Sequence, residues 1–309
     1  MKTPNLKSTL LTLLFYFVIT FFLVSCKSDT EDVKNKGYIV TDDLNNKIHF
    51  EEMPNRVITL APNLTEMIFD LGLQNFLVGN TLHCNYPDEA KKIEKVGDLL
   101  TFNFEQIVKL NPDLIFITVE GNTKETYEKF KELGLKIFVS NPRNFNGVKK
   151  TFSDIGKVFK IEEKVDKTIN DWENSIDKIK SDKKSFVNMT AMFLIELKPI
   201  MLAGRTTFLN EYLEYNGLKN IADDVEFNYP IFNREEILRR NPDFIIYPTG
   251  GDDTIEKIIS VYPEWKNLKA VKKGNVVFIN RDLYMRPGSR FVEALADLNA
   301  LLHQLQNLH

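Results

Sequence analysis

The chain has few of the residues from which metal and redox sites are built. It contains two cysteines, no CxxC pair and four histidines in 309 residues. His83 and Cys84 are adjacent, but neighbouring residues of an extended chain point to opposite sides, so this pair makes a poor chelate. We therefore expect no metal site built from several histidines, although His83 stays open as an axial ligand of a bound metal complex.

Signals of catalysis and of nucleic-acid binding are also missing. The sequence has no serine elbow, phosphate-binding loop or pair of catalytic acids. Its formal net charge is -3 and it has no basic or low-complexity stretch, so no nucleic-acid partner is expected. These absences favour a binding protein over an enzyme; an adhesion or enzyme domain is the alternative.

The first residues are typical of an export signal. Lys2 and Lys7 precede an uncharged run, of which residues 10 to 24 read LLTLLFYFVITFFLV. The run ends in Leu-Val-Ser-Cys, which resembles the bacterial lipoprotein box, where a lipidated cysteine becomes the new N-terminus. We expect a signal peptide (residues 1–25), a lipid on Cys26, a flexible tether (residues 26–37) and an extracytoplasmic protein held at a membrane. A transmembrane anchor is the alternative.

If Cys26 carries a lipid, only Cys84 remains as a thiol. An intramolecular disulfide is then excluded, even in an oxidising compartment. Stability must therefore come from packing.

One segment of the sequence occurs twice, 130 positions apart. Residues 102 to 116 read FNFEQIVKLNPDLIF, and residues 232 to 246 read FNREEILRRNPDFII. Each copy places an asparagine at the N-cap of a helix, a glutamate in its first turn and Asn-Pro at its end. The repeat predicts two lobes of like construction.

The two first-turn glutamates, Glu105 and Glu235, allow two interpretations. The helix macrodipole stabilises such a carboxylate by about 0.3 to 1 kcal/mol, which alone would explain both residues. If a pseudo-twofold axis relates the lobes, however, the carboxylates project from equivalent corners of one face. They could then dock on matching arginines of a partner.

Strand and helix patterns alternate along both halves of the chain. This alternation predicts parallel sheets covered by helices, with an edge hairpin at the start. A further helix is expected to open at Asn63, with Glu66 closing a capping box. The expected strands are residues 38–40, 48–50, 57–60, 76–79, 114–119, 136–140, 244–248 and 276–280, and the expected helices are 104–110, 124–132, 207–215 and 290–305.

A segment without helix breakers lies between the two halves. Residues 157 to 198 include neither glycine nor proline, and apolar residues recur there at spacings of four and three: Val165, Ile169, Trp172, Ile176 and Ile179. We predict a long helix that joins the lobes as a rigid strut; a surface helix within one lobe is the alternative. The expected division is an N-terminal lobe (38–145), linking helices (146–182) and a C-terminal lobe (183–309).

Two Tyr-Pro loops and two helix starts could line a cleft between the lobes. Tyr86 and Tyr229 each precede a proline in a loop, so their rings could sandwich a large flat ligand or simply pack on their own sheets. Arg205 precedes the first helix of the second lobe, and Arg286 and Arg290 precede the last helix. If these helix starts face the cleft, the arginines could meet carboxylate or phosphate groups.

These features together resemble the family of periplasmic substrate-binding proteins for cobalamin and iron complexes. The resemblance covers about residues 55 to 305 and rests, in order, on RVITLAPNLTEMIFDLGL, HCNYP, NFEQIVKLNPDLIF, the linking helix and YPIFNREEILRRNPDFII. It implies an α/β fold of two Rossmann-like lobes joined by a single long helix, as in class III substrate-binding proteins. It also implies a monomer that captures cobalamin or another corrinoid and delivers it to the permease and ATPase of an ABC importer. A ferric siderophore or haem is the alternative ligand.

The resemblance assigns roles to individual residues as well. By position, Tyr86 matches a corrin-contacting tyrosine of the cobalamin-binding members, and Tyr229 matches a pocket tryptophan. Glu105 and Glu235 match two glutamates that pair with permease arginines. No cofactor is implied beyond the transported ligand. The chain departs from the pattern at residues 199–201 and 283–285, which offer fewer aromatic side chains. The other residues expected at the ligand are Pro62, Asn63, Met201, Arg205, Tyr284, Arg286 and Arg290.

Overall fold

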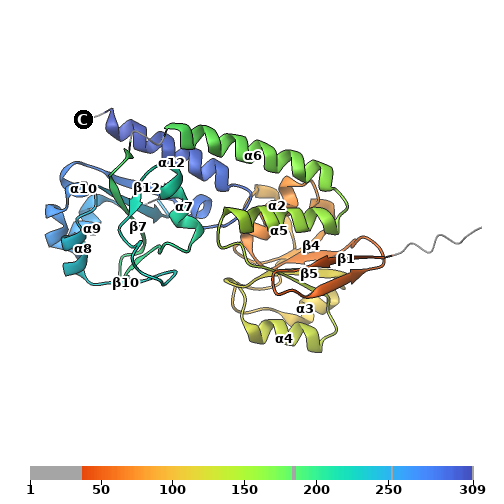
Figure 1. Cartoon of the computed structure of the whole chain (residues 1–309). Helices are drawn as coiled ribbons and strands as arrows, with labels where there is room; N and C mark the ends of the chain where they lie inside the picture. Colours follow the sequence, from red (N-terminus) through yellow and green to blue (C-terminus); the bar gives the residue numbers. More distant parts are fainter. Residues whose placement is uncertain (1–36, 183–185, 252, 308–309) are drawn as a thin grey trace, which may run out of the picture.

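The computed structural model describes residues 37–182, 186–251 and 253–307, which form two α/β lobes (Figure 1). The expected signal peptide, Cys26 and nearly all of the tether lie outside these described residues. Within the described ranges, no helix is both long and apolar enough to cross a membrane.

The N-terminal lobe contains a four-stranded parallel sheet in the order β4-β3-β5-β6. Every residue of the central strand β5 is buried, as expected for a strand covered on both faces. The predicted edge hairpin is present as an antiparallel pair. The elements of this lobe are β1 (Tyr38–Thr41), β2 (Lys47–Phe50), β3 (Val57–Thr59), α2 (Pro62–Asp70), β4 (Leu77–Asn80), α3 (Phe104–Lys109), β5 (Leu114–Thr118), α4 (Lys124–Glu132), β6 (Ile137–Ser140) and α5 (Phe145–Val158), with short 3-10 turns at Gln74–Phe76 and Asp88–Lys92.

The C-terminal lobe contains a mixed sheet in the order β10-β8-β7-β11-β12, with β9 paired to β7. The prediction of a parallel sheet is therefore only partly right here, because β8 and β10 run antiparallel to their neighbours. The elements are β7 (Thr190–Glu196), β8 (Ile200–Leu202), α7 (Phe208–Tyr215), β9 (Lys219–Asn220), β10 (Ile231–Phe232), α8 (Arg234–Arg240), β11 (Phe244–Thr249), α9 (Ile255–Val261), a 3-10 turn at Pro263–Asn267, α10 (Lys269–Lys272), β12 (Val276–Asn280), α11 (Arg281–Tyr284) and α12 (Phe291–Gln306).

The helix α6 (Glu162–Asp182) joins the two lobes, as predicted for a strut. It contacts α5 of the first lobe and α7 and α12 of the second, and Figure 1 shows it running along the top of both. The helical segment before it is broken at Lys160, whose φ of 54° ends α5. Trp172, from the predicted apolar stripe, packs its ring 4.6 Å from that of Phe152 on α5. Packing on both sides therefore holds α6 in place.

The duplicated segment forms the same structure in both lobes. Asn103 and Asn233 cap α3 and α8, and each side chain accepts a hydrogen bond from the backbone N–H three residues later. Asn111 and Asn241 follow the two helices with a left-handed φ of 45°. Asparagine tolerates this conformation better than most residues, so both helices end at the same step.

The aspartates that close each copy have a further common role. Asp113 Oδ2 accepts the backbone N–H groups of Asn55 and Arg56 at 2.8 and 2.9 Å, just before β3 begins. Asp243 Oδ2 accepts the backbone N–H of Thr190, the first residue of β7, at 2.9 Å. Each copy thus ties the start of one strand to the start of its parallel neighbour, which explains why Asn-Pro-Asp is repeated.

Candidate functional site

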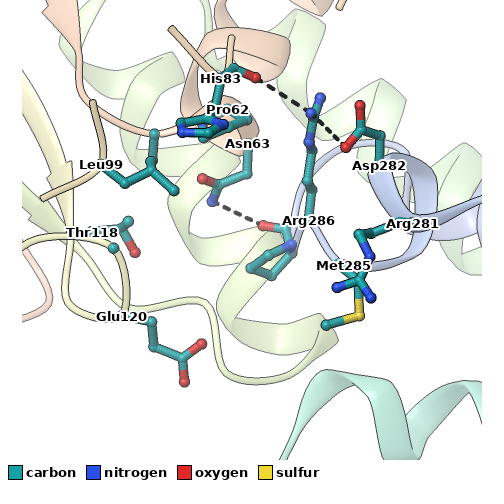
Figure 2. A pocket seen from close by; sticks show the side chains of 13 residues that line it. Pro62, Asn63, His83, Leu99, Thr118, Glu120, Arg281, Asp282, Met285 and Arg286 are labelled. Atoms are coloured by element: carbon teal, nitrogen blue, oxygen red, sulfur yellow. Dashed lines mark hydrogen bonds and ion pairs between the residues drawn. The ribbon is translucent and has the colours of Figure 1, made fainter. Parts of the chain in front are cut away.

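A cavity of about 350 Å³ lies between the two lobes (Figure 2). Asn63, His83, Leu99 and Glu120 line it from the N-terminal lobe, and Figure 2 shows Asp282, Met285 and Arg286 on the opposite wall. The full lining is Ala61, Pro62, Asn63, His83, Leu99, Thr118, Glu120, Gly121, Arg281, Asp282, Met285, Arg286 and Pro287.

The wall residues follow the carboxyl ends of parallel strands. Pro62 comes just after β3, Glu120 just after β5 and Arg281 directly after β12. In the first sheet, β4 lies on one side of β3 and β5 on the other. The order in which strands are added to the sheet therefore reverses between β3 and β5, which makes this place a topological switch point. Open parallel sheets bind ligands at such switch points. The cavity is thus where this topology predicts a binding site.

A buried carboxylate holds the base of the cavity together. Glu66, on α2, is 1% exposed and accepts hydrogen bonds from two arginines of the C-terminal lobe. Its Oε1 lies 2.6 Å from Arg286 Nη1 and 2.9 Å from Arg290 Nη2. Because both guanidinium groups are nearly buried, these bonds form in a medium of low polarity.

The capping box expected at the start of this helix is therefore wrong. α2 begins at Pro62 with Ala61 as its N-cap, and no side chain caps it. Glu66 points instead to arginines about 220 residues further along the chain. The spacing from Asn63 to Glu66 fits a capping box. A glutamate in the first turns of a helix can equally form a long-range ion pair, and the spacing does not distinguish the two roles.

Further polar contacts cross the same junction. Asn63 Nδ2 donates to the carbonyl of Pro287 at 3.1 Å, and Ser289 Oγ donates to Asp70. Burial raises the pKa of Asp70, and the bond from Ser289 opposes that shift. Gly288 fits closely here, since a Cβ at this position would lie 3.2 Å from Asn63 Cβ. The two lobes therefore meet tightly at the base of the cavity.

Of the residues expected at the ligand, the structure brings Pro62, Asn63 and Arg286 to the cavity wall. Tyr86 stands next to them, 43% exposed, and the guanidinium of Arg290 lies 3.9 Å above its ring. Arg290 is also held by Glu66, so the expected contact of both arginines with ligand carboxylates must compete with an existing ion pair.

Tyr229 of the C-terminal lobe contacts a wall residue of the cavity but does not itself line it. Its hydroxyl lies 3.5 Å from Oε2 of Glu120, which lines the wall. Burial, followed by the nearby Glu120, raises the pKa of Tyr229 well above its ordinary value, so its hydroxyl keeps its proton at neutral pH. The loop that carries Tyr229 therefore forms the edge of the cleft opposite Glu120.

Three expected ligand contacts lie elsewhere. Tyr284 is fully buried and donates its hydroxyl hydrogen bond to Asp297 at 2.7 Å, which makes it a core residue and contradicts the prediction. Met201 pairs in β8 with Ile231 of β10, and Arg205 forms an ion pair with Glu226 at 3.2 Å. Neither Met201 nor Arg205 lines the cavity.

Glu120 and Arg281 were missed as site residues. Each follows a parallel strand within two residues, Glu120 after β5 and Arg281 after β12, and this position at a strand end is the sequence signal that could have found them. Among the described residues, no group of three or more histidine, cysteine or acidic side chains could hold a metal ion.

Glu105 and Glu235 lie outside the cavity, in the first turns of α3 and α8. Both are exposed, and no described residue forms a hydrogen bond or ion pair with either carboxylate. The neighbouring Glu236, by contrast, is bound by Arg239 and Arg240. The repeated glutamates are thus the two acidic side chains of these helix starts that remain available to a partner.

Residues 57–283 match a protein-family model described as periplasmic binding protein. The chain belongs to this family. Its members are non-enzymatic components of transport systems, so the expectation that the chain is not an enzyme is confirmed. The predicted fold class, two α/β lobes of the class III type, is confirmed as well.

The chain also resembles individual members. It is 29% identical over 268 residues, 84% of each chain, to the uncharacterized ABC transporter substrate-binding lipoprotein YvrC of Bacillus subtilis. It is 27% identical over 255 residues to a vitamin B12-binding protein of Pectobacterium carotovorum, covering 82% of this chain and 90% of that one.

Solved structures give the same result. A possible iron-binding periplasmic protein of Staphylococcus epidermidis superposes with a TM-score of 0.70 at 28% identity, covering 81% of this chain and 98% of that one. The periplasmic vitamin B12 binding protein of Vibrio cholerae superposes with a TM-score of 0.69 at 25% identity, covering 82% and 98%. The chain is therefore a substrate-binding protein of an ABC importer, and its relatives are periplasmic or extracytoplasmic binding proteins.

We expect Glu66→Gln to lower the free energy of unfolding by about 3 to 5 kcal/mol, because it leaves two nearly buried arginines without a counter-charge. Urea unfolding at neutral pH measures the loss. Glu236→Gln is the matched control, since Glu236 also binds two arginines but its side chain is 26% exposed. Its loss should be much smaller; equal losses would contradict the role of burial.

Proposed function

We propose that the chain captures a corrinoid of the cobalamin type between its lobes and delivers it to an ABC permease. The similarity to vitamin B12-binding proteins supports this ligand class. The observation that carries the proposal is the balance of charge around the cavity. The similarity to a possible iron-binding protein supports the alternative, a ferric siderophore or haem.

Positive and negative side chains around the cavity cancel. Apart from the pair of His83 and Asp98, three arginines and three carboxylates lie in or beside its wall, and two of these carboxylates form ion pairs with arginines. They are Arg281, Arg286 and Arg290, and Glu66, Glu120 and Asp282. Haem carries propionates and many siderophores are anionic, so a receptor for either gains from an excess of positive charge. A corrin ring carries neutral acetamide and propionamide groups, which can donate to Glu120 and accept from Arg281.

The rim of the cleft offers apolar surface for a ligand larger than the cavity. Leu82 and Leu100, each next in sequence to a wall residue, are 62% and 72% exposed, and Phe227, two residues before Tyr229, is 74% exposed. Apolar side chains close to a binding cavity can add contact area for a ligand. A flat macrocycle seated in the cavity would cover part of this surface.

The ligand can be identified by calorimetric titration of a soluble form that lacks residues 1–26. We expect cyanocobalamin to bind at least about tenfold more tightly than haem or a ferric siderophore, because the balanced cleft disfavours anions. Tighter binding of haem or siderophore with no corrinoid bound would replace the proposal by its alternative. Glu120→Gln removes one negative charge from the balance and should shift the preference towards the anionic ligands.

We also propose that Glu105 and Glu235 position the loaded receptor on the permease. Their exposure, their equivalent places in the two lobes and their lack of partners among the described residues support this role. Two such carboxylates at fixed separation can each bind an arginine of a partner, which sets orientation as well as affinity.

The double variant Glu105→Ala, Glu235→Ala should keep its affinity for the ligand but lose most of the uptake in cells. Glu125 and Glu256 supply a matched control, because they are also exposed first-turn glutamates, one in each lobe, on α4 and α9. Their double alanine variant changes the charge equally and should transport normally. Reduced ligand affinity in the first variant, or equal loss of uptake in both, would argue against docking at Glu105 and Glu235.

The proposal includes a lipid on Cys26, which is supported by the lipoprotein box and by the description of the Bacillus subtilis relative as a lipoprotein. We expect the wild-type protein in the membrane fraction, and Cys26→Ser in the soluble extracytoplasmic fraction or retained as an uncleaved precursor. Radiolabelled palmitate should enter the wild type alone. Unlabelled wild-type protein would rule out the lipid.

A further inference from the structure

His83 lies on the cavity wall and is held from two sides. It sits in the loop after β4, and its backbone carbonyl accepts a hydrogen bond from Arg286 Nη2 at 3.3 Å. Its side chain is 53% exposed. Figure 2 shows it among the residues that line the cavity. The position of this ring is therefore tied to the same arginine that joins the lobes.

A carboxylate fixes one nitrogen of the His83 ring. Nε2 lies 2.8 Å from Asp98 Oδ1, and the same oxygen accepts the backbone N–H of Leu99 at 2.5 Å. Asp98 Oδ1 therefore accepts from Leu99, and a carboxylate oxygen that accepts in this way has no hydrogen to donate, so Nε2 of His83 is the donor of the second contact and carries the proton.

The other ring nitrogen, Nδ1, is then the basic one in the neutral ring. No described residue forms a hydrogen bond with it. Histidines that bind a metal almost always donate their second N–H to a carboxylate, carbonyl or water, which fixes the tautomer and raises the basicity of the ligating nitrogen. The contact between His83 and Asp98 has this arrangement, at the wall of a cavity. An exposed pair of this kind adds little to stability.

We propose that Nδ1 of His83 coordinates the metal at the centre of the bound corrinoid, with Asp98 as the positioning residue. The proposal rests on the proposed function and adds to it a bond between protein and cargo. With a cobalt(III) corrinoid that carries an axial water, the Nδ1–Co bond forms and the Co–OH2 bond breaks. The water leaves, no proton is transferred and the cobalt keeps its oxidation state.

Visible absorption of the full chain, purified in detergent and mixed with aquocobalamin, tests the bond. Replacement of water by imidazole shifts the absorption bands, so the wild type should shift them and His83→Gln should not. Asp98→Asn should weaken aquocobalamin binding by about 10- to 100-fold, the usual effect of losing such a partner. His49→Gln is the matched control, because His49 is exposed and does not line this cavity.

Cyanocobalamin separates this proposal from the proposed function. Its cyanide holds the axial position firmly, so it should bind to the wild type and to His83→Gln with similar affinity and without a shift. If cyanocobalamin and aquocobalamin both bind but the bands of aquocobalamin stay in place, His83 is not a ligand, although the corrinoid function stands. If neither corrinoid binds, the proposed function itself fails.

Discussion

The contact of Glu66 with Arg286 and Arg290 holds the two lobes in their relative orientation. It places one negative and two positive side chains, all nearly buried, at the junction of α2 with the loop before α12. Charged groups are costly to bury unless they are paired. If the lobes separated at this junction, all three side chains would lose their partners, and only water could replace them. Arg286 belongs both to this contact and to the cavity wall. Asn63 and Gly288 pack closely at the same junction.

The remaining parts of the site follow from sheet topology. The residues that follow parallel strands lie along one edge of a sheet. In both lobes this edge faces the cleft. Residues that follow β3, β5 and β12 therefore line one cavity although they are far apart in sequence. α6 keeps the two edges facing each other, because it packs on α5 in one lobe and on α7 and α12 in the other. The fold therefore supplies a cleft of fixed shape, and the identity of a few loop residues decides its chemistry.

The sequence alone predicted the local features well. The repeat, the strut and the strands came from spacing, and the structure adds that both copies of Asn-Pro-Asp link two strand starts. Contacts between distant residues were not predictable in the same way. Glu66 was predicted to cap its helix, because its true partners stand about 220 positions later in the sequence. Tyr284 was predicted to line the cleft, because the sequence does not reveal that its hydroxyl binds Asp297 in the core. Glu120 and Arg281, by contrast, directly follow the predicted parallel strands β5 and β12, so their places at strand ends were predictable.

The stacking of Arg290 on Tyr86 joins two tasks in one side chain. The guanidinium covers one face of the ring and at the same time binds Glu66 across the junction. Whatever rests on the free face of Tyr86 thus lies one ring thickness from the charge that holds the lobes together. A ligand on this face would change the electrostatic environment of the Arg290 guanidinium even if the backbone hardly moved. The occupied and the empty protein would then differ at the junction of the lobes without a large change of shape.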